Sequence, residues 1–363
     1  MALLVDGHCH QVLAGEVDRP AFELACTEAD LPPPPGLSYV DSQLGLAVRR
    51  WCAPVLGLPA HVPVDEYLAA RAALGWERAT TALLHAAGLA ALLVDTGLDG
   101  PHLVTPAALE TLAGAPVREV VRLERVAEDL AGHVDAAGFA DAYAQALTER
   151  VRDAVAVKSV LAYRHGLAIP PERPSTVDVR RAAGEWLRSP GRLTDPVLLR
   201  HILWAGVDTG LPLQLHTGFG DRNLALSTAD PALAQPFLAA VGVPVVLLHC
   251  YPYHRQAGWL AQVYPHVYVD VGLTLTHLGS RAPAVLAEYL ELAPFGKLLF
   301  STDAYLLPEL YLVGAAQFRH ALRTLLDQWV ADGATTTADA DRITEQLGTG
   351  NARRTYGDLS PGS

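Results

Sequence analysis

Val5-Asp6-Gly7-His8-Cys9-His10 is an apolar stretch near the start of the chain that ends in two histidines. Successive side chains of a β-strand alternate between its faces, so in a strand His8 and His10 point to one side and Cys9 to the other. Two neutral imidazoles that converge in this way can supply half of a divalent-metal site. An isolated pair is more often a strand that happens to carry two histidines, so this interpretation depends on further ligands from later strands.

The composition is that of a globular protein with a large core, since 50% of the 363 residues are hydrophobic and 18% are charged. A formal net charge of −12 and the lack of any basic run argue against a nucleic-acid partner, because phosphate binding needs clustered lysines and arginines. No positively charged segment precedes the first apolar residues, and the longest apolar tract is shorter than the ~20 residues that span a bilayer. We therefore expect a cytoplasmic protein without a membrane partner.

Short apolar segments alternate with helical patterns along the chain. We expect strands over residues 2–10, 91–95, 117–123, 154–159, 211–216, 244–249, 267–272 and 297–303. Parallel strands need a return helix between them, so this alternation predicts a (β/α)8 TIM barrel, with residues 1–363 as one domain. A doubly wound sheet is the alternative. It is less favoured because Gly218-Phe219-Gly220 continues without the third glycine of G-x-G-x-x-G.

Residues 11–81 are too long for an ordinary connection between the first two strands. They include Pro32-Pro33-Pro34-Pro35-Gly36, which cannot be helix or central strand. We interpret 11–81 as an insertion within the barrel, with a helix over 64–74 after Pro63. It leaves the first strand at the end that carries the histidines, so we expect part of it to act as a lid. Further helices are expected at 139–151, 177–187, 196–209, 255–263, 283–292, 309–329 and 339–356.

Polar side chains stand at the carboxyl ends of five of these apolar strands. In a barrel those ends surround one mouth, where the active sites of this fold lie. A single such residue is more often a hydrogen-bonded core histidine than a ligand, but random placement would not repeatedly choose the same end. The sequence therefore predicts a divalent-metal centre at this mouth, formed by His8, His10, Lys158, His216, His249 and Asp303.

Two motifs around these residues resemble those of the amidohydrolase superfamily, in its amidohydrolase-2 branch. They are Lys158-Ser159-x-x-Ala162-Tyr163-Arg164-x-Gly166-Leu167 and Gln214-Leu215-His216-Thr217-Gly218. They look like the motifs of fungal and plant proteins that fuse such a barrel to a glutamine-synthetase domain, which these 363 residues do not contain. The similarity extends from His8 to about Asp303. It implies that the histidines of the first, fifth and sixth strands and Asp303 bind or serve one or two divalent ions.

The number of ions stays open. With one ion, the first-strand histidines, His216 and Asp303 ligate it, and His249 polarises the substrate or acts as acid or base. With two ions, Lys158 carboxylated by CO2 supplies a bridge, as in binuclear members of the superfamily, and His216 with His249 holds the second ion. An unmodified ammonium beside a dication is unfavourable, so we favour two ions. In the one-ion alternative, Lys158 binds a substrate carboxylate.

The ligand types narrow the choice of metal only partly. Imidazole and carboxylate ligands suit zinc, our first expectation, and also iron, manganese or nickel. A thiolate site is not indicated, because Cys9, Cys26, Cys52 and Cys250 show no C-x-x-C spacing.

These ligands point to hydrolysis, because a bound cation lowers the pKa of its water and polarises a carbonyl. Asp303 is the best general base, with His249 as a second catalytic group. The expected substrate is a small molecule with an amide, first a γ-glutamyl amide as the glutamine-synthetase fusions suggest, or an ester, lactone or thioester. A metal-dependent decarboxylase or hydratase of the same branch is the alternative, and a non-catalytic barrel is a third interpretation. A serine hydrolase would need a G-x-S-x-G motif, which is absent.

Several residues that follow the strands at this mouth are candidates for substrate binding, although loops there also carry ordinary polar residues. Arg164 could fork onto a carboxylate or phosphate, or serve in a salt bridge or helix cap. A homodimer is the assembly to test. The candidates are Tyr163, Arg164, Tyr251, His254, His277 and Tyr305, with Tyr253 and Glu309 as further neighbours.

Overall fold

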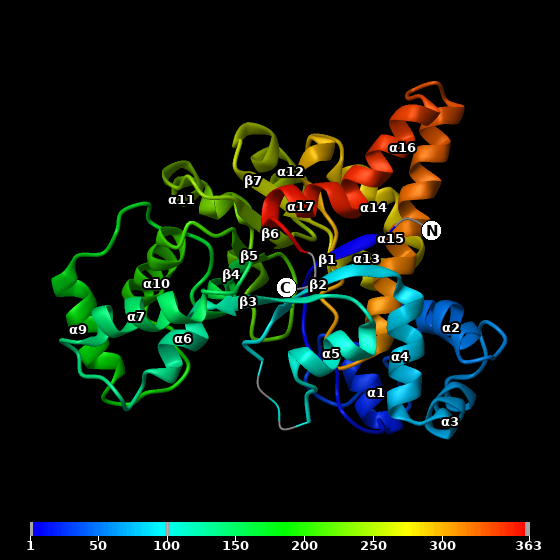
Figure 1. The fold of residues 1–363 in the computed structure, drawn as a ribbon, viewed down its shortest axis with the longest axis horizontal. Coiled ribbons are helices and arrows are strands. Elements are labelled where there is room, and N and C mark those ends of the chain that lie inside the picture. Colours follow the sequence, from blue (N-terminus) through cyan, green and yellow to red (C-terminus); the bar gives the residue numbers. More distant parts are fainter. Residues whose placement is uncertain (1–2, 99, 101, 360–363) are drawn as a thin grey trace.

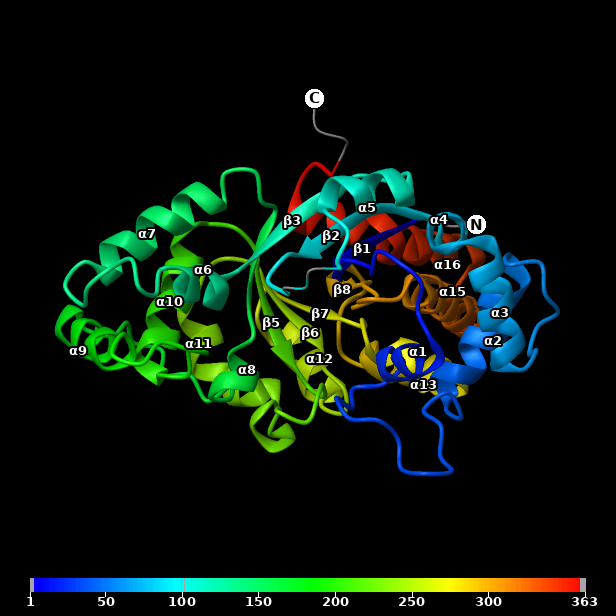
Figure 2. The same ribbon diagram turned by 90° about the horizontal axis from the view of Figure 1, so that it is seen from below.

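The structure is a computed structural model that describes residues 3–98, 100 and 102–359. Within this part of the chain, eight strands form one sheet in which every neighbouring pair is parallel. Their spatial order follows the sequence, which confirms the predicted (β/α)8 barrel (Figure 2). The strands are β1 (Leu4–Cys9), β2 (Leu89–Asp95), β3 (Val117–Arg122), β4 (Ala156–Ser159), β5 (Leu213–Thr217), β6 (Val245–His249), β7 (Val267–Asp270) and β8 (Leu298–Leu299).

Helices connect the strands and surround the barrel (Figure 1). Local sequence sets several of their starts: α10 begins where the side chain of Asp195 accepts hydrogen bonds from two backbone N–H groups and proline occupies the first turn. The helices are α1 (Arg19–Ala25), α2 (Gln43–Val55), α3 (Val64–Leu74), α4 (Trp76–Ala87), α5 (Pro106–Ala113), α6 (Leu123–Asp129), α7 (Phe139–Arg150), α8 (Leu161–Arg164), α9 (Thr176–Trp186), α10 (Pro196–Asp208), α11 (Gln235–Ala240), α12 (His254–Val263), α13 (Thr274–Leu278), α14 (Ala282–Tyr289), α15 (Pro308–Ala331), α16 (Thr337–Glu345) and α17 (Asn351–Tyr356).

The insertion between β1 and β2 is helical, as expected, and α3 has the predicted bounds. It also contains α1 and α2, which the sequence did not predict. A buried ion pair ties it to the barrel: Glu309 of α15 accepts hydrogen bonds from Arg71 Nε (2.8 Å) and from the Tyr67 hydroxyl (2.8 Å). Glu309 is fully buried and therefore anchors the insertion to α15.

The barrel closes through a segment that is not a regular strand. β8 has only two residues, whereas a strand was predicted over 297–303. Beyond it, the N–H of Gly7 donates to the carbonyl of Phe300 (3.0 Å) and the N–H of Asp303 donates to the carbonyl of His8 (3.0 Å). The predicted strand was therefore too long: beyond Leu299 the chain keeps hydrogen bonds to the first strand but not a regular ladder, and Asp303 adopts a left-handed backbone with φ +50°.

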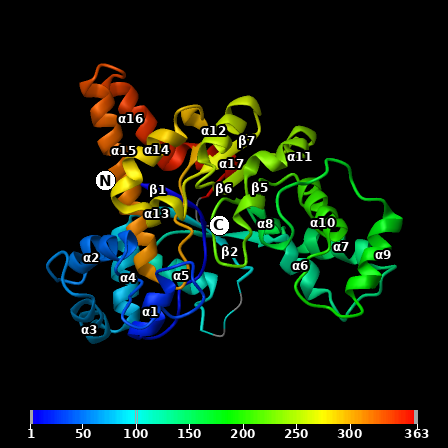
Figure 3. The ribbon, with the colours of Figure 1, turned by 180° about the vertical axis from the view of Figure 1, so that it is seen from behind.

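Between β3 and β5 the chain adds a helical lobe to one side of the barrel (Figures 1 and 3). The lobe consists of α6, α7, α9 and α10, which pack against one another. The sequence predicted α7, α9 and α10 individually, but nothing in it showed that they gather into one body. The predicted helix over 339–356 is also interrupted, because a turn of π-helix over Gln346–Gly350 separates α16 from α17.

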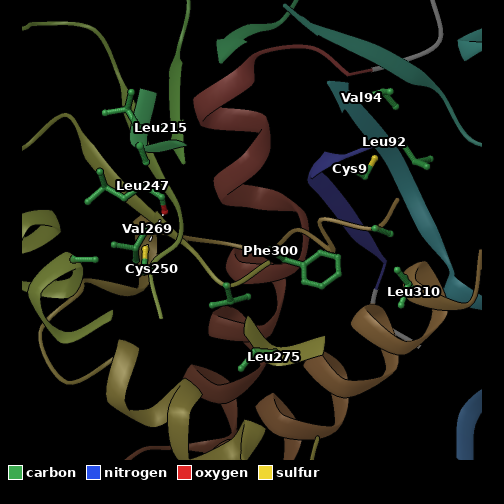
Figure 4. Packing of buried hydrophobic residues seen from close by; sticks show 14 of the residues in the cluster. Cys9, Leu92, Val94, Leu215, Leu247, Cys250, Val269, Leu275, Phe300 and Leu310 are labelled. Carbon is green, nitrogen blue, oxygen red and sulfur yellow. Dashed lines mark hydrogen bonds between the residues drawn. The ribbon is translucent and has the colours of Figure 1, made fainter. Parts of the chain in front are cut away.

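Apolar side chains fill two layers, one between the strands and the helices and one inside the barrel. Leu92, Leu215 and Leu247 belong to the outer layer (Figure 4), and Leu93 and Leu248 to the inner one. Burial of this apolar surface, at about 25 cal/mol per Å², is the main force that holds the helices on the sheet. A search of the described helices finds none with the length and apolar character needed to cross a membrane.

Candidate functional site

Three histidines surround the carboxylate of Asp303 at the mouth of the barrel. Nε2 of His8 lies 3.2 Å from one carboxylate oxygen, Nε2 of His10 lies 3.5 Å from the same oxygen, and Nε2 of His249 lies 3.5 Å from the other. The site thus joins residues from β1, from β6 and from the segment after β8. His8 and Asp303 are 295 positions apart in the sequence. His8, His249 and Asp303 offer ligand atoms that lie within 4.8 Å of one another, and so do His8, His10 and Asp95, so either group could hold a metal ion.

The other ring nitrogen of each of these histidines faces a hydrogen-bond acceptor. Nδ1 of His8 donates to Oε1 of Gln214 (2.9 Å), Nδ1 of His10 to the carbonyl of Asp95 (3.0 Å) and Nδ1 of His249 to the carbonyl of Gly272 (3.3 Å). With the proton on Nδ1, the lone pair of each Nε2 points to the carboxylate of Asp303. Electron-rich atoms that face each other so closely need a cation or a proton among them, which is the arrangement of a metal centre.

His216, at the end of β5, extends this cluster toward the cavity. Its ring centre lies 4.6 Å from that of His249 and 4.5 Å from that of Tyr163. Nε2 of His216 and Nε2 of His249 are buried and have no hydrogen-bond partner among the described residues. Buried polar atoms are rarely left in this state, so both nitrogens fit the role of metal ligands.

Burial keeps these imidazoles neutral, which is the form that binds metals. It lowers the pKa of His8 to about 3 and that of His249 to about 4, and it holds the pKa of His216 well below its ordinary value. Burial would raise the pKa of Asp303, but the surrounding imidazoles, first His249, hold it well below its usual range. The site therefore combines neutral imidazoles with an ionised carboxylate.

Lys158, at the end of β4, points into the same cluster. Its Nζ lies 2.7 Å from Nε2 of His8 and 3.9 Å from Oδ2 of Asp95. The side chain is almost completely buried, and burial lowers the pKa of its ammonium group. The structure thus brings all six predicted residues to one mouth.

The backbone at His249 departs from the strand that carries it. His249 and Cys250 both have φ +67°, and the hydroxyl groups of Thr274 and Tyr289 donate to the carbonyl of His249. This turn lets the His249 ring face the mouth although the preceding Leu248 already points into the barrel. Left-handed backbone at residues other than glycine costs about 1–3 kcal/mol and is concentrated at functional sites.

Sequence reasoning missed a buried ion pair beside Lys158. Nε and Nη2 of Arg122 donate to Oδ2 of Asp95, at 3.0 and 2.6 Å. Burial would raise the pKa of Asp95, but Arg122 lowers it to far below its usual value. Asp95 ends β2 and Arg122 ends β3, so the rule that found the histidines at strand ends would also have found this pair.

The cluster opens into a cavity of about 1050 Å³. His10, Lys158, His216 and Asp303 lie on its floor, and the predicted substrate-binding residues Tyr163, Arg164 and Tyr305 line it. One wall comes from the insertion, through residues of α1 and the loop that follows, among them Leu24 and Glu28.

Three predicted substrate-binding residues do not line this cavity. His254 binds Glu288 through Nε2 (2.7 Å), and its ring stacks on Tyr251. Nε2 of His277 lies 3.8 Å from Glu28, behind the wall that the insertion forms. The neighbouring Tyr253 donates its hydroxyl to the carbonyl of Leu226. Tyr251, Tyr253 and His254 follow the left-handed turn after β6, whereas His277 lies in α13, after β7.

Comparisons with known proteins agree with this geometry. A sequence model of the amidohydrolase family matches residues 57–357. The protein fluG of Emericella nidulans is 32% identical over 271 residues, which cover 68% of this chain and 31% of that protein, so the match spans about a third of its length.

Solved structures show the same relationship. One is a protein of Lactobacillus casei that is described, by inference, as a metal-dependent hydrolase. It is 29% identical to this chain, with a TM-score of 0.85, and the match covers 98% of this chain and 95% of the other. The glucuronate isomerase of Caulobacter crescentus is 15% identical, with a TM-score of 0.64 over 98% of this chain and 91% of its own, and shares the fold alone.

Proposed function

The chain belongs to the amidohydrolase family, and from this premise we propose that it is a metal-dependent hydrolase that cleaves a carbonyl–heteroatom bond of a small organic molecule. The observation that carries the proposal is the convergence of His8, His10 and His249 on the carboxylate of Asp303, within 3.5 Å. His10 and Asp303 of this donor set line the cavity. Enzymes of the family act on small molecules, which a cavity of about 1050 Å³ accommodates.

We assign metal binding to His8, His10, Lys158, His216, His249 and Asp303. A divalent cation held there, zinc in the first instance, supplies Lewis acidity that lowers the pKa of water and polarises a carbonyl oxygen. The ionised carboxylate of Asp303 takes the proton of the attacking water and delivers it to the leaving group. His249, whose Nε2 has no hydrogen-bond partner among the described residues, is the second catalytic group in the one-ion form, where it polarises the substrate or acts as acid or base.

We further propose that Lys158 carries a carbamate and that the centre is binuclear. As an ammonium, Nζ at 2.7 Å donates a hydrogen bond to the lone pair of His8 Nε2 and so competes with any cation for it. The lowered pKa of Lys158 raises the fraction of neutral amine, whose nitrogen forms a bond to the carbon of CO2 and releases one proton to water. The carbamate is an anion, so it attracts the cations that the ammonium would repel.

Two variants test the hydrolase proposal. Asp303→Asn and His216→Ala are assayed with zinc on a panel of γ-glutamyl amides, other amides, lactones and thioesters, together with the exposed controls Asp332→Asn and His133→Ala. We expect Asp303→Asn to lose a factor of about 10²–10⁴ in kcat, as for a general base, and His216→Ala to lose bound metal as well. Undiminished turnover in both variants rejects the assignment.

Metal analysis separates the one-ion and two-ion forms of the proposal. The protein is loaded with zinc in buffer purged of CO2 and in buffer with bicarbonate. We expect wild type to bind two ions per chain only in the buffer with bicarbonate. We expect Lys158→Met to bind one ion per chain in both buffers. One ion in every case would reject the carbamate. It would also favour the decarboxylase or hydratase alternative, which product analysis of a carboxylic acid substrate then tests.

A further inference from the structure

The walls of the cavity differ in charge. Arg125, Arg164 and Arg192 line the side formed by α6, α8 and the loop after α9, where Glu128 and Asp129 of α6 offset part of their positive charge. Glu28 and Asp221 line another part of the cavity, together with Asp30. A substrate that enters therefore meets a field that favours one orientation of any charge it carries.

Arg164 is buried with only part of its guanidinium satisfied. Its side chain is 8% exposed, and Nη1 donates to Oε1 of Glu128 at 2.9 Å. Its Nε is buried and has no hydrogen-bond partner within the described residues. A buried N–H of a charged group that lacks an acceptor is costly, and Arg164 lines a cavity in which a ligand can offer an acceptor to its guanidinium.

Arg192 stands beside it as a second cation. It is exposed, it lines the same cavity, and no described carboxylate forms an ion pair with it. The backbone N–H of Leu193 donates to Oε1 of Glu128 (2.8 Å), the same oxygen that binds Arg164, so one carboxylate holds the Arg192 loop against Arg164. Burial and the charge of Arg192 both lower the pKa of Arg164. Arg192 thus adds a second positive charge beside that of Arg164.

We propose that Arg164 and Arg192 form a subsite for a free carboxylate of the substrate, remote from the bond that is cleaved. A carboxylate accepts two parallel N–H bonds from a guanidinium, which matches the unused donors here. The other arginines that line the cavity are engaged, since Arg122 binds Asp95 and Arg125 binds Asp129, each at 2.6 Å.

This subsite narrows the substrate class to monoamides or monoesters of dicarboxylic acids, with the free acid at the arginines and the acyl carbonyl near Asp303. The inference rests on the proposed function only for the identity of the cleaved bond. Binding of the carboxylate itself needs no turnover, so it can be measured separately.

Calorimetry with glutarate and with its neutral diamide, glutaramide, tests the subsite in metal-free and in zinc-loaded protein. The variant is Arg192→Gln, and the matched control is Arg188→Gln, an exposed arginine four residues away that does not line the cavity. We expect Arg192→Gln to raise the Kd of glutarate about tenfold, with the Kd of glutaramide unchanged and no effect of Arg188→Gln on either ligand. Arg164→Gln should weaken glutarate binding at least as much.

A Kd of glutarate that is the same in Arg192→Gln and in wild type overturns the subsite, as does a failure of wild type to bind any dicarboxylate. Inorganic phosphate that binds more tightly than glutarate, with the same dependence on Arg192, overturns the carboxylate assignment in favour of a phosphate ester. The hydrolase proposal fails separately, through undiminished turnover of Asp303→Asn. The two failures are therefore distinguishable.

Discussion

Gln214 determines how His8 faces the centre, and replacing it by methionine should weaken metal binding. The side chain of Gln214 is fully buried in β5. Oε1 accepts the Nδ1 proton of His8 (2.9 Å), and Nε2 donates to the carbonyl of Gly7 (2.7 Å) and to the hydroxyl of Tyr356 in α17 (2.9 Å). Methionine has nearly the same length and fills the space, but it accepts no comparable hydrogen bond.

The size of the effect follows from what His8 loses. Without its acceptor, the ring is free to change tautomer and to rotate, and loss of such a partner typically costs 10- to 100-fold in metal affinity. This corresponds to about 1.4–2.7 kcal/mol. The Gly7 carbonyl and Tyr356 hydroxyl also lose a donor, at about 1–3 kcal/mol each, so the metal-free protein is destabilised as well.

Zinc affinity is measured by competition with a fluorescent chelator, and stability by urea unfolding of the metal-free protein. Gln214→Glu is the informative second variant, because its carboxylate still accepts the Nδ1 proton of His8; it should keep the affinity within about threefold of wild type. Gln235→Met, on the surface, is the control. An affinity of Gln214→Met equal to that of wild type, or one of Gln214→Glu as weak as that of Gln214→Met, would refute the reasoning.

Three further predictions concern stability. Glu309→Gln leaves Arg71 buried beside a neutral amide, so the free energy of unfolding in urea should fall by about 3–5 kcal/mol, and a fall below 1 kcal/mol would contradict the anchor. Because Arg122 holds the pKa of Asp95 below its unfolded value, this pair stabilises the fold above about pH 4, and its contribution declines as the pH falls further. In metal-free protein, the free energy of unfolding of Asp95→Asn should therefore fall less steeply below pH 4 than that of wild type. An equally steep fall in both proteins would contradict this prediction. Finally, zinc at 1,000 times its Kd should stabilise the protein by about 4 kcal/mol, so a Tm that does not change on chelation excludes a specific centre.

The barrel and the meeting of the six residues could be predicted because both depend on simple rules. Parallel strands place their carboxyl ends at one mouth, and a polar residue such as His216 is easily recognised near the end of an apolar strand such as β5. The same rule applies to Asp95 and Arg122, which end β2 and β3.

The misplaced residues have a different cause. Strand alternation cannot anticipate the left-handed backbone of His249 and Cys250, which turns the chain so that Tyr251 and His254 stack away from the cavity. The hydrogen bond between Gln214 and His8 could not be predicted for a related reason. The two residues are 206 positions apart in the sequence, and no local sequence pattern indicates that they are in contact. Such contacts depend on the register of β1 against its neighbours.

Closure of the barrel and assembly of the site use the same hydrogen bonds. The N–H of Asp303 donates to the carbonyl of His8, and the N–H of His10 donates to the carbonyl of Ala304 (2.8 Å). Below them, the buried carboxylate of Asp6 accepts hydrogen bonds from the N–H (2.9 Å) and the hydroxyl (2.5 Å) of Thr302. β1 and the segment that carries Asp303 therefore cannot separate unless the barrel opens. The short β8 and the strained backbone of Asp303 follow from this, because the last strand has to turn its carboxylate onto the histidines of the first.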